Sequence, residues 1–114
     1  MLDKTLLALE EVMKDEYRIA AVRHGGTFAS AHEGYAVILE EVEEAKADLN
    51  ALELYVDALW RCVKADKYTN DEQLKVLQRR AIHAAGELIQ VAAMVYKFKH
   101  SQDVQIEIEK EEAR

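Results

Sequence analysis

Residues 35–63 read YAVILEEVEEAKADLNALELYVDALWRCV. Apolar side chains recur in this stretch at alternating steps of three and four residues, the spacing that places them on one face of an α-helix. The stripe continues without a slip through Tyr35, Ile38, Val42, Ala45, Leu49, Leu52, Val56, Leu59 and Val63. The pattern predicts one long helix that packs against other helices over its whole length.

Two further helices are predicted on either side of this stretch. The first covers about residues 2–22 and is stopped by Gly25 and Gly26. Its buried stripe is expected to consist of Leu2, Leu6, Leu9, Met13, Tyr17 and Ala20. The last helix repeats the spacing and is expected to end near residue 100. Its stripe is Leu74, Leu77, Ala81, Ala84, Leu88, Val91, Val95 and Phe98.

Side chains that can cap helices stand where two of these helices should begin. Ser30 and Glu33 form the Ser-x-x-Glu pattern of a capping box, so the long helix should start at this point. After a polar segment over residues 64–71, Thr69 or Asn70 can cap the last helix.

The composition indicates an all-α fold, a bundle of three to four helices. The chain has 114 residues, no proline and four glycines, which suits one domain built from long helices. We expect that domain over residues 1–100 and a frayed, charged tail over residues 101–114. A helix over residues 30–65 would be about 50 Å long, more than one small domain covers. Either it breaks near residues 48–50, giving a four-helix monomer, or two chains pair; the unbroken stripe favours a homodimer or homotetramer.

The charge and the cysteine content limit the classes of partner. A formal net charge of −7 disfavours binding to nucleic acid or to an anionic membrane. Cys62 is the only cysteine, so no intrachain disulfide can form, and the chain suits a reducing compartment. The first residues match neither a secretory signal nor a membrane span, so a cytoplasmic location is expected.

Three carboxylates, Glu41, Glu44 and Asp48, follow one edge of the apolar stripe. Residues three, four and seven apart share a helix face, so these acids should stack beside the core. Stacked carboxylates repel one another unless Arg, Lys or a metal ion neutralises them. We expect a hard divalent cation there, and Glu40 and Glu43 should point further toward solvent.

The last helix offers a matching face. Glu87 precedes the stripe position Leu88, with His83 one turn before it and Gln90 three residues after it. Several carboxylates and an amide carbonyl suit Mg²⁺, with Mn²⁺ as the alternative. A di-iron bundle would require Glu-x-x-His pairs, which are absent. Zinc is disfavoured because no second compact His or Cys cluster completes its coordination.

Four segments carry a resemblance to a known family. EEVEE (residues 40–44) matches the EExxE signature of the MazG-like all-α nucleoside triphosphate pyrophosphohydrolases, and ELIQ (residues 87–90) resembles their ExxD motif. HEGYAVIL (residues 32–39) and QVAAM (residues 90–94) are similar to a phage-associated and prokaryotic branch of these proteins. The resemblance covers about residues 28–99 with an insertion around residues 50–71.

The resemblance implies Mg-dependent hydrolysis of a nucleoside triphosphate between its α and β phosphates. It places metal ligands at Glu41, Glu44 and Glu87, and neutral Gln90 stands where the family has an Asp. From its place on the acidic ridge, we hypothesise that Asp48 supplies the missing carboxylate. A carboxylate not fully used as a ligand, Glu40 or Glu44, could accept the proton from the attacking water.

Groups that could bind the substrate lie near the glycine loop and on the last helix. Arg23, His24 and Lys97 are the cations expected near phosphate oxygens, and Tyr35 is one of the aromatic side chains available to a base, with Phe28, Tyr55 and Trp60. Two other functions fit the same residues. One is a non-catalytic nucleotide-binding relative that has lost a metal ion because Gln90 is neutral. The other is a helical dimerisation or scaffold module whose acidic side chains are solvated.

Overall fold

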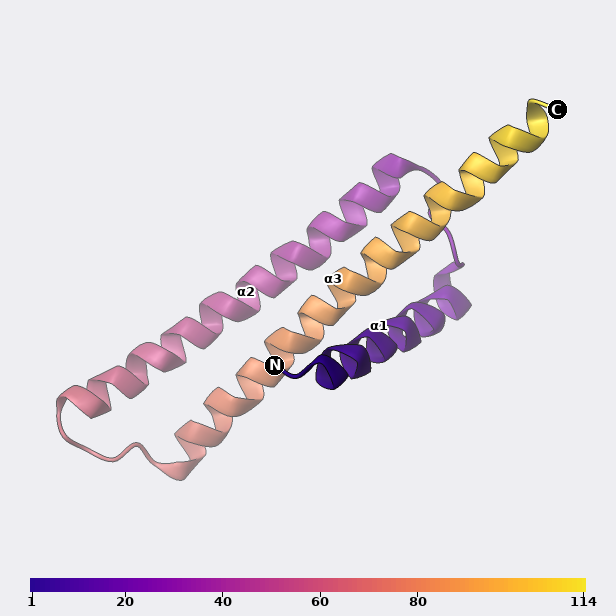
Figure 1. The fold of residues 1–114 in the computed structure, drawn as a ribbon. Coiled ribbons are helices and arrows are strands. Elements are labelled where there is room, and N and C mark those ends of the chain that lie inside the picture. The colour runs from indigo at the N-terminus through magenta and orange to yellow at the C-terminus, as the bar shows by residue number, and fades with distance from the viewer. The chain divides into compact units, whose positions relative to one another are not determined.

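The computed structural model describes all 114 residues and contains three helices and no strands. Helix α1 covers Asp3–His24, α2 covers Ala31–Lys64 and α3 covers Asp71–Glu112 (Figure 1). The predicted all-α fold is confirmed. None of the three helices combines the length and the apolar character needed to cross a lipid bilayer.

The predicted helix boundaries near the loops are confirmed by their capping contacts. Gly25, which follows α1, has a φ of 85° and donates its N–H to the carbonyl of Ala21 over 2.9 Å. Ser30 Oγ accepts the N–H of Glu33 over 3.1 Å at the start of α2, and Asn70 Oδ1 accepts the N–H of Gln73 over 2.8 Å at the start of α3. Each contact satisfies a backbone group that the helix leaves unpaired.

Helix α2 is unbroken over its 34 residues, so the alternative with a break near residues 48–50 is wrong. Proline, the strongest helix breaker, is absent, and residues 48–50 have no glycine either. One chain leaves the apolar stripe partly uncovered: Tyr35 is 65% exposed, Val56 48% and Val63 53%. The pairing of two chains along this stripe stays a prediction.

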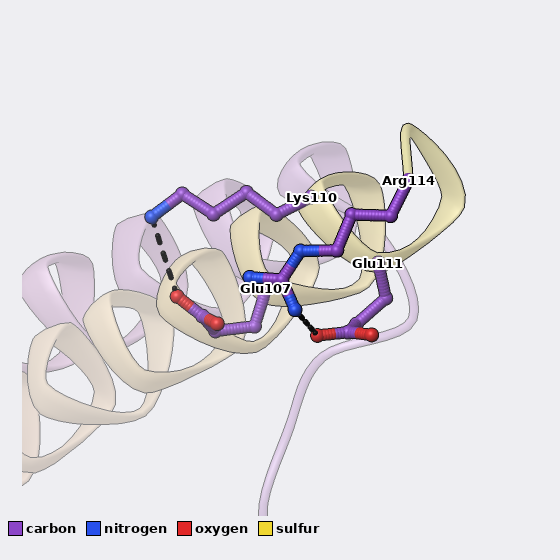
Figure 2. Close-up of polar contacts among 4 residues, drawn as sticks. All are labelled: Glu107, Lys110, Glu111 and Arg114. Carbon is purple, nitrogen blue, oxygen red and sulfur yellow. Dashed lines mark hydrogen bonds and ion pairs between the residues drawn. The ribbon is translucent and has the colours of Figure 1, made fainter.

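Helix α3 does not end near His100 but continues to Glu112, so the expected fraying of residues 101–114 is wrong. Opposite charges three residues apart stabilise its last turns: Lys110 pairs with Glu107 over 3.4 Å, and Arg114 with Glu111 over 2.9 Å (Figure 2). Earlier on α3, Lys99 donates to Asp103 over 2.9 Å, and this hydrogen bond raises the pKa of the Lys99 ammonium. A helix supported by local pairs does not need a buried apolar face.

The chain forms two compact units. Unit 1 consists of Met1–Glu41 and Ile89–Arg114, and unit 2 consists of Val42–Leu88. In unit 2, the buried Ala45 of α2 and Ala84 of α3 are small, which allows two helices to approach closely. In unit 1, the buried apolar side chains are Ala93 and Met94 of α3.

Contacts within unit 1 hold α1 and the loop after it against α3, which runs in the same direction as α1 (Figure 1). The rings of Tyr17 and Tyr96 lie 5.0 Å apart, centre to centre, and the Tyr17 hydroxyl donates to the carbonyl of Gly26 over 2.8 Å. Further along, Phe28 N–H donates to Ser101 Oγ over 2.8 Å. The two helices are therefore parallel in this unit.

Two helical glycines should respond to Ala in opposite directions. A Cβ on Gly34 would lie 2.6 Å from Phe98 Cδ2 and 2.9 Å from Phe28 Cδ2, whereas a Cβ on Gly86 meets nothing within 4 Å. Gly86→Ala should raise the free energy of unfolding by about 0.5–1 kcal/mol, because it lowers the entropy of the unfolded chain. Gly34→Ala should lower it by about 1–3 kcal/mol through overpacking. Urea denaturation of both variants checks this pair, and a stabilised Gly34→Ala protein would contradict the close packing.

Candidate functional site

Unit 2 brings together a group of metal-ligating side chains from α2 and α3. The potential ligand atoms of Asp48, His83 and Glu87 all lie within 4.8 Å of one another. His83 Nδ1 is 2.9 Å from Asp48 Oδ2, with the His83 side chain 61% and the Asp48 side chain 21% exposed. Asp48 therefore lies beside Glu87, with the imidazole of His83 as its hydrogen-bond partner. The hypothesis that Asp48 supplies a carboxylate to a metal stays a prediction.

Glu44 also lies close to the carboxylate of Glu87. The oxygens of Glu44 and Glu87 lie within 4.8 Å of each other, with Glu87 partly buried and Glu44 exposed. The expectation that Glu44 lies beside the core is therefore wrong, because this side chain is in contact with water. Glu40 and Glu43 are exposed, as predicted.

The chemistry of these donors fits a divalent cation. Carboxylate oxygens are the ligands that Mg²⁺ and Mn²⁺ prefer, and an imidazole adds a nitrogen donor that suits Mn²⁺ better than Mg²⁺. Neighbouring carboxylates repel one another until a cation joins them. Glu44, Asp48 and Glu87 therefore form a donor set that an ion would stabilise.

Unit 1 contains a cavity of about 500 Å³ that most of the other predicted site residues line. Its wall is formed by α1, the loop after it, the start of α2 and the middle of α3. The lining residues are Glu16, Ile19, Ala20, Arg23, His24, Phe28, Glu33, Val37, Glu41, Gln90, Met94 and Lys97. Arg23, His24 and Lys97, which the sequence placed near a substrate phosphate, thus share one cavity. Tyr35 and Glu40 do not line it.

The cavity has two ends of different polarity. Glu16 and Gln90 are joined at one end by a hydrogen bond of 2.6 Å. Arg23 follows Glu16 by seven residues on α1, and Lys97 follows Gln90 by seven residues on α3. Both cations therefore lie two turns, or about 10 Å, further along their helices. Ile19, Ala20 and Met94 add apolar side chains to the lining. Spacing along the helices therefore separates the Glu16–Gln90 pair from Arg23 and Lys97, the cationic end of the cavity.

Lys97 is the most unusual side chain at the cationic end, because it is a lysine with only 5% of its surface exposed. Its ammonium lies 4.4 Å from the centre of the Phe28 ring, close enough for a cation–π interaction. Arg23 and His24 are exposed at the end of α1, and Glu33 contributes one carboxylate from the first turn of α2. Burial of an ammonium group beside a cavity favours occupation of that cavity by an anion.

Glu16 is a site residue that the sequence did not reveal. It lies on α1 and is partly buried against Gln90 of α3, 74 residues away in the chain. The one local signal was its position four residues before the stripe residue Ala20. Glu41 lines the same cavity and is partly buried, one helical turn before Glu44 on α2.

No protein-family model, curated protein or solved structure matches this chain.

Proposed function

We propose that the protein is a Mg-dependent nucleoside triphosphate pyrophosphohydrolase, which cleaves a ribo- or deoxyribonucleoside triphosphate to the monophosphate and pyrophosphate. The observation that carries the proposal is the lining of the unit 1 cavity, which combines carboxylate and amide oxygens, apolar side chains and cations. A metal ion with its bound phosphates needs oxygen donors and cations in one site. The resemblance of residues 28–99 to the MazG-like family points to the same reaction.

Each group has a role in this proposal. Arg23, His24 and Lys97 bind phosphate oxygens, and the Phe28 ring with Met94 forms an apolar wall that excludes water. Glu40 or Glu44 accepts the proton from the attacking water.

The metal is assigned to the acidic residues that the resemblance names. Glu41, Glu44 and Glu87 hold Mg²⁺ or Mn²⁺, and Asp48 and Gln90 add further oxygen donors. The ion, when bound, offsets the charge of the phosphates and activates water. Two copies of the chain, paired along the exposed part of the α2 stripe as a homodimer or as half of a homotetramer, complete the bundle.

Pyrophosphate release tests the proposal directly. The purified protein is incubated with Mg²⁺ and each ordinary nucleoside or deoxynucleoside triphosphate, beside a Glu41→Gln variant and a sample with EDTA. We expect release by the wild-type chain that falls at least about 100-fold in the variant, because the ion loses a charged ligand. Equal release by both proteins would show that a contaminant or another site is responsible.

A negative result would separate the two remaining functions. Saturable nucleotide binding without pyrophosphate release would identify a non-catalytic nucleotide-binding protein, as neutral Gln90 would suggest. A melting temperature that responds to neither nucleotide nor divalent ions would instead identify a scaffold module with solvated acids.

A further inference from the structure

Unit 2 is a hairpin formed by the second part of α2 and the first part of α3 (Figure 1). Its only buried apolar residues are Ala45 and Ala84, and no larger side chain of the hairpin is buried. A helix is stabilised when its apolar stripe is covered by another element, and two helices alone cover each other on one side only. The hairpin therefore lacks most of the core that a helical bundle has.

One face of the hairpin gathers large apolar side chains from both helices. On α2, Val56, Trp60 and Val63 are four and three residues apart, so they share a helix face. On α3, Leu74 and Ile82 are two turns apart, and these five side chains are between 43% and 67% exposed. A groove of about 610 Å³ lies between the two helices, and its apolar lining consists of Leu52, Val56, Leu74, Leu77 and Ala81.

The groove carries no net charge. Its charged lining residues are one acid and one base, Asp71 and Lys75, whose side chains pair with each other over 3.2 Å. Two copies of a chain with a formal net charge of −7 repel each other, so they associate most readily through a neutral face. The acidic donors Glu44, Asp48 and Glu87 do not line this groove.

The accessible surface of the chain is large enough to supply an extensive interface. It amounts to 8733 Å², whereas a globular protein of 13.0 kDa exposes about 6300 Å². The difference of about 2400 Å² exceeds the roughly 800 Å² that each partner contributes to a stable complex of standard size. The area available for burial is therefore that of an obligate dimer.

We propose that a second copy of the chain covers this face, so that two unit 2 hairpins pack into a four-helix bundle around a two-fold axis. In such a contact each copy presents the same surface, and a neutral, apolar face is complementary to itself. A second copy is also present whenever the chain folds, which suits a hairpin that lacks its own core. The proposed function requires pairing along α2 only; this inference adds α3 to the interface and does not depend on the reaction.

Val56→Glu tests the interface, with Leu54→Glu as its matched control. Both positions carry exposed apolar side chains of α2, but they lie about 200° apart around the helix, so Leu54 points away from the groove. We expect the wild-type chain to sediment with at least twice the mass of one chain. Val56→Glu should weaken dimerisation at least about 100-fold, because a two-fold contact brings two carboxylates into an apolar interface. Leu54→Glu should dimerise like the wild type in the same sedimentation-equilibrium experiment.

Ile82→Glu tests the part of the interface that lies on α3. Ile82 is 67% exposed in one chain, so the substitution leaves the packing of the hairpin itself unchanged. It should also weaken dimerisation, by about 10–100-fold, because the new carboxylate is buried only when two chains meet. Unchanged helix content by circular dichroism confirms that each variant folds.

Trp60 reports on the same face without any substitution, because it is the only tryptophan of the chain. As the wild-type protein is diluted, its emission should move to longer wavelength at the concentration where the mass falls to that of one chain. This measurement decides the matter if Val56→Glu does not fold. Emission that stays constant through dissociation would place the contact on another surface.

The outcomes separate this interface from the proposed function. A wild-type chain that is monomeric at every concentration, or dimerisation that survives Val56→Glu, would overturn the interface. Dimerisation weakened by Val56→Glu and not by Ile82→Glu would overturn the role of α3 and leave pairing along α2. A dimer sensitive to both substitutions, in a chain that releases no pyrophosphate, would support the interface and overturn the hydrolase. A monomer that releases pyrophosphate would overturn the interface alone.

Discussion

Replacement of Glu87 by Gln should lower the rate of pyrophosphate release at least about 100-fold, the scale expected when one group that stabilises charge at a reaction centre is lost. Glu87 is the carboxylate common to the donors of unit 2, since its oxygens lie within 4.8 Å of the ligand atoms of Asp48 and His83 and of those of Glu44. Gln keeps the size of the side chain and an oxygen donor, but removes the charge that attracts the cation.

The stability of the same variant should change in the other direction. Without metal, Glu44, Asp48 and Glu87 bring negative charges close together, and removal of one of them relieves repulsion. The metal-free Glu87→Gln protein should therefore melt at the wild-type temperature or above, whereas the increase in melting temperature that Mg²⁺ gives the wild-type chain should be lost. Differential scanning calorimetry with and without Mg²⁺ measures both effects.

Glu43→Gln is the matched control for this experiment, because Glu43 belongs to the same acidic motif but is exposed. It should keep both turnover and the response to Mg²⁺. Wild-type turnover by Glu87→Gln at low Mg²⁺ would remove Glu87 from the reaction and, with it, the assignment of the acidic motifs to a metal.

The helices could be predicted because their signals are local. The stripe that predicts α2 and the caps at Ser30 and Asn70 depend on neighbours a few residues away, and the structure confirms the helix and both caps. It does not confirm packing along the whole stripe, because Leu49, Val56 and Val63 are exposed. The end of α3 differs from the prediction because a helix can continue without a buried apolar face. Residues 101–112 continue the helix with ion pairs such as Lys110–Glu107, which supply local stabilisation instead.

The candidate site was predictable where the apolar stripes of α2 and α3 orient the acids beside them, and obscure where α1 meets α3. Glu44 and Asp48 are one turn apart on α2, so their neighbourhood followed from spacing alone. The contact of Glu16 with Gln90 depends on how α1 lies against α3, which no local pattern encodes. Tyr35, which the sequence offers as a partner for a base, is exposed and does not line the cavity, so its role stays a prediction.

Replacement of Lys97 by Met should weaken nucleotide binding about 10–100-fold, since a charge-assisted hydrogen bond contributes about 1.5–3 kcal/mol and each 1.4 kcal/mol is tenfold in affinity. Lys97 is 5% exposed at the cationic end of the cavity, with its ammonium over the Phe28 ring. Met has a similar length and fills the same space, so the variant removes the charge and keeps the packing. Calorimetric titration with a non-hydrolysable nucleoside triphosphate analogue measures the loss.

The free energy of unfolding of Lys97→Met should meanwhile stay the same or rise. Burial of an ammonium costs several kcal/mol in desolvation, more than the roughly 0.5–2 kcal/mol that a cation–π contact returns. That outcome, together with weaker nucleotide binding, would indicate that the charge of Lys97 serves a ligand and not the stability of the fold. Lys99→Met, which removes an exposed lysine paired with Asp103, is the control and should change neither quantity appreciably. Unchanged nucleotide affinity in Lys97→Met would mean that the cationic end of the cavity does not hold a phosphate, and the polarity of the cavity would then lose its connection to the proposed reaction.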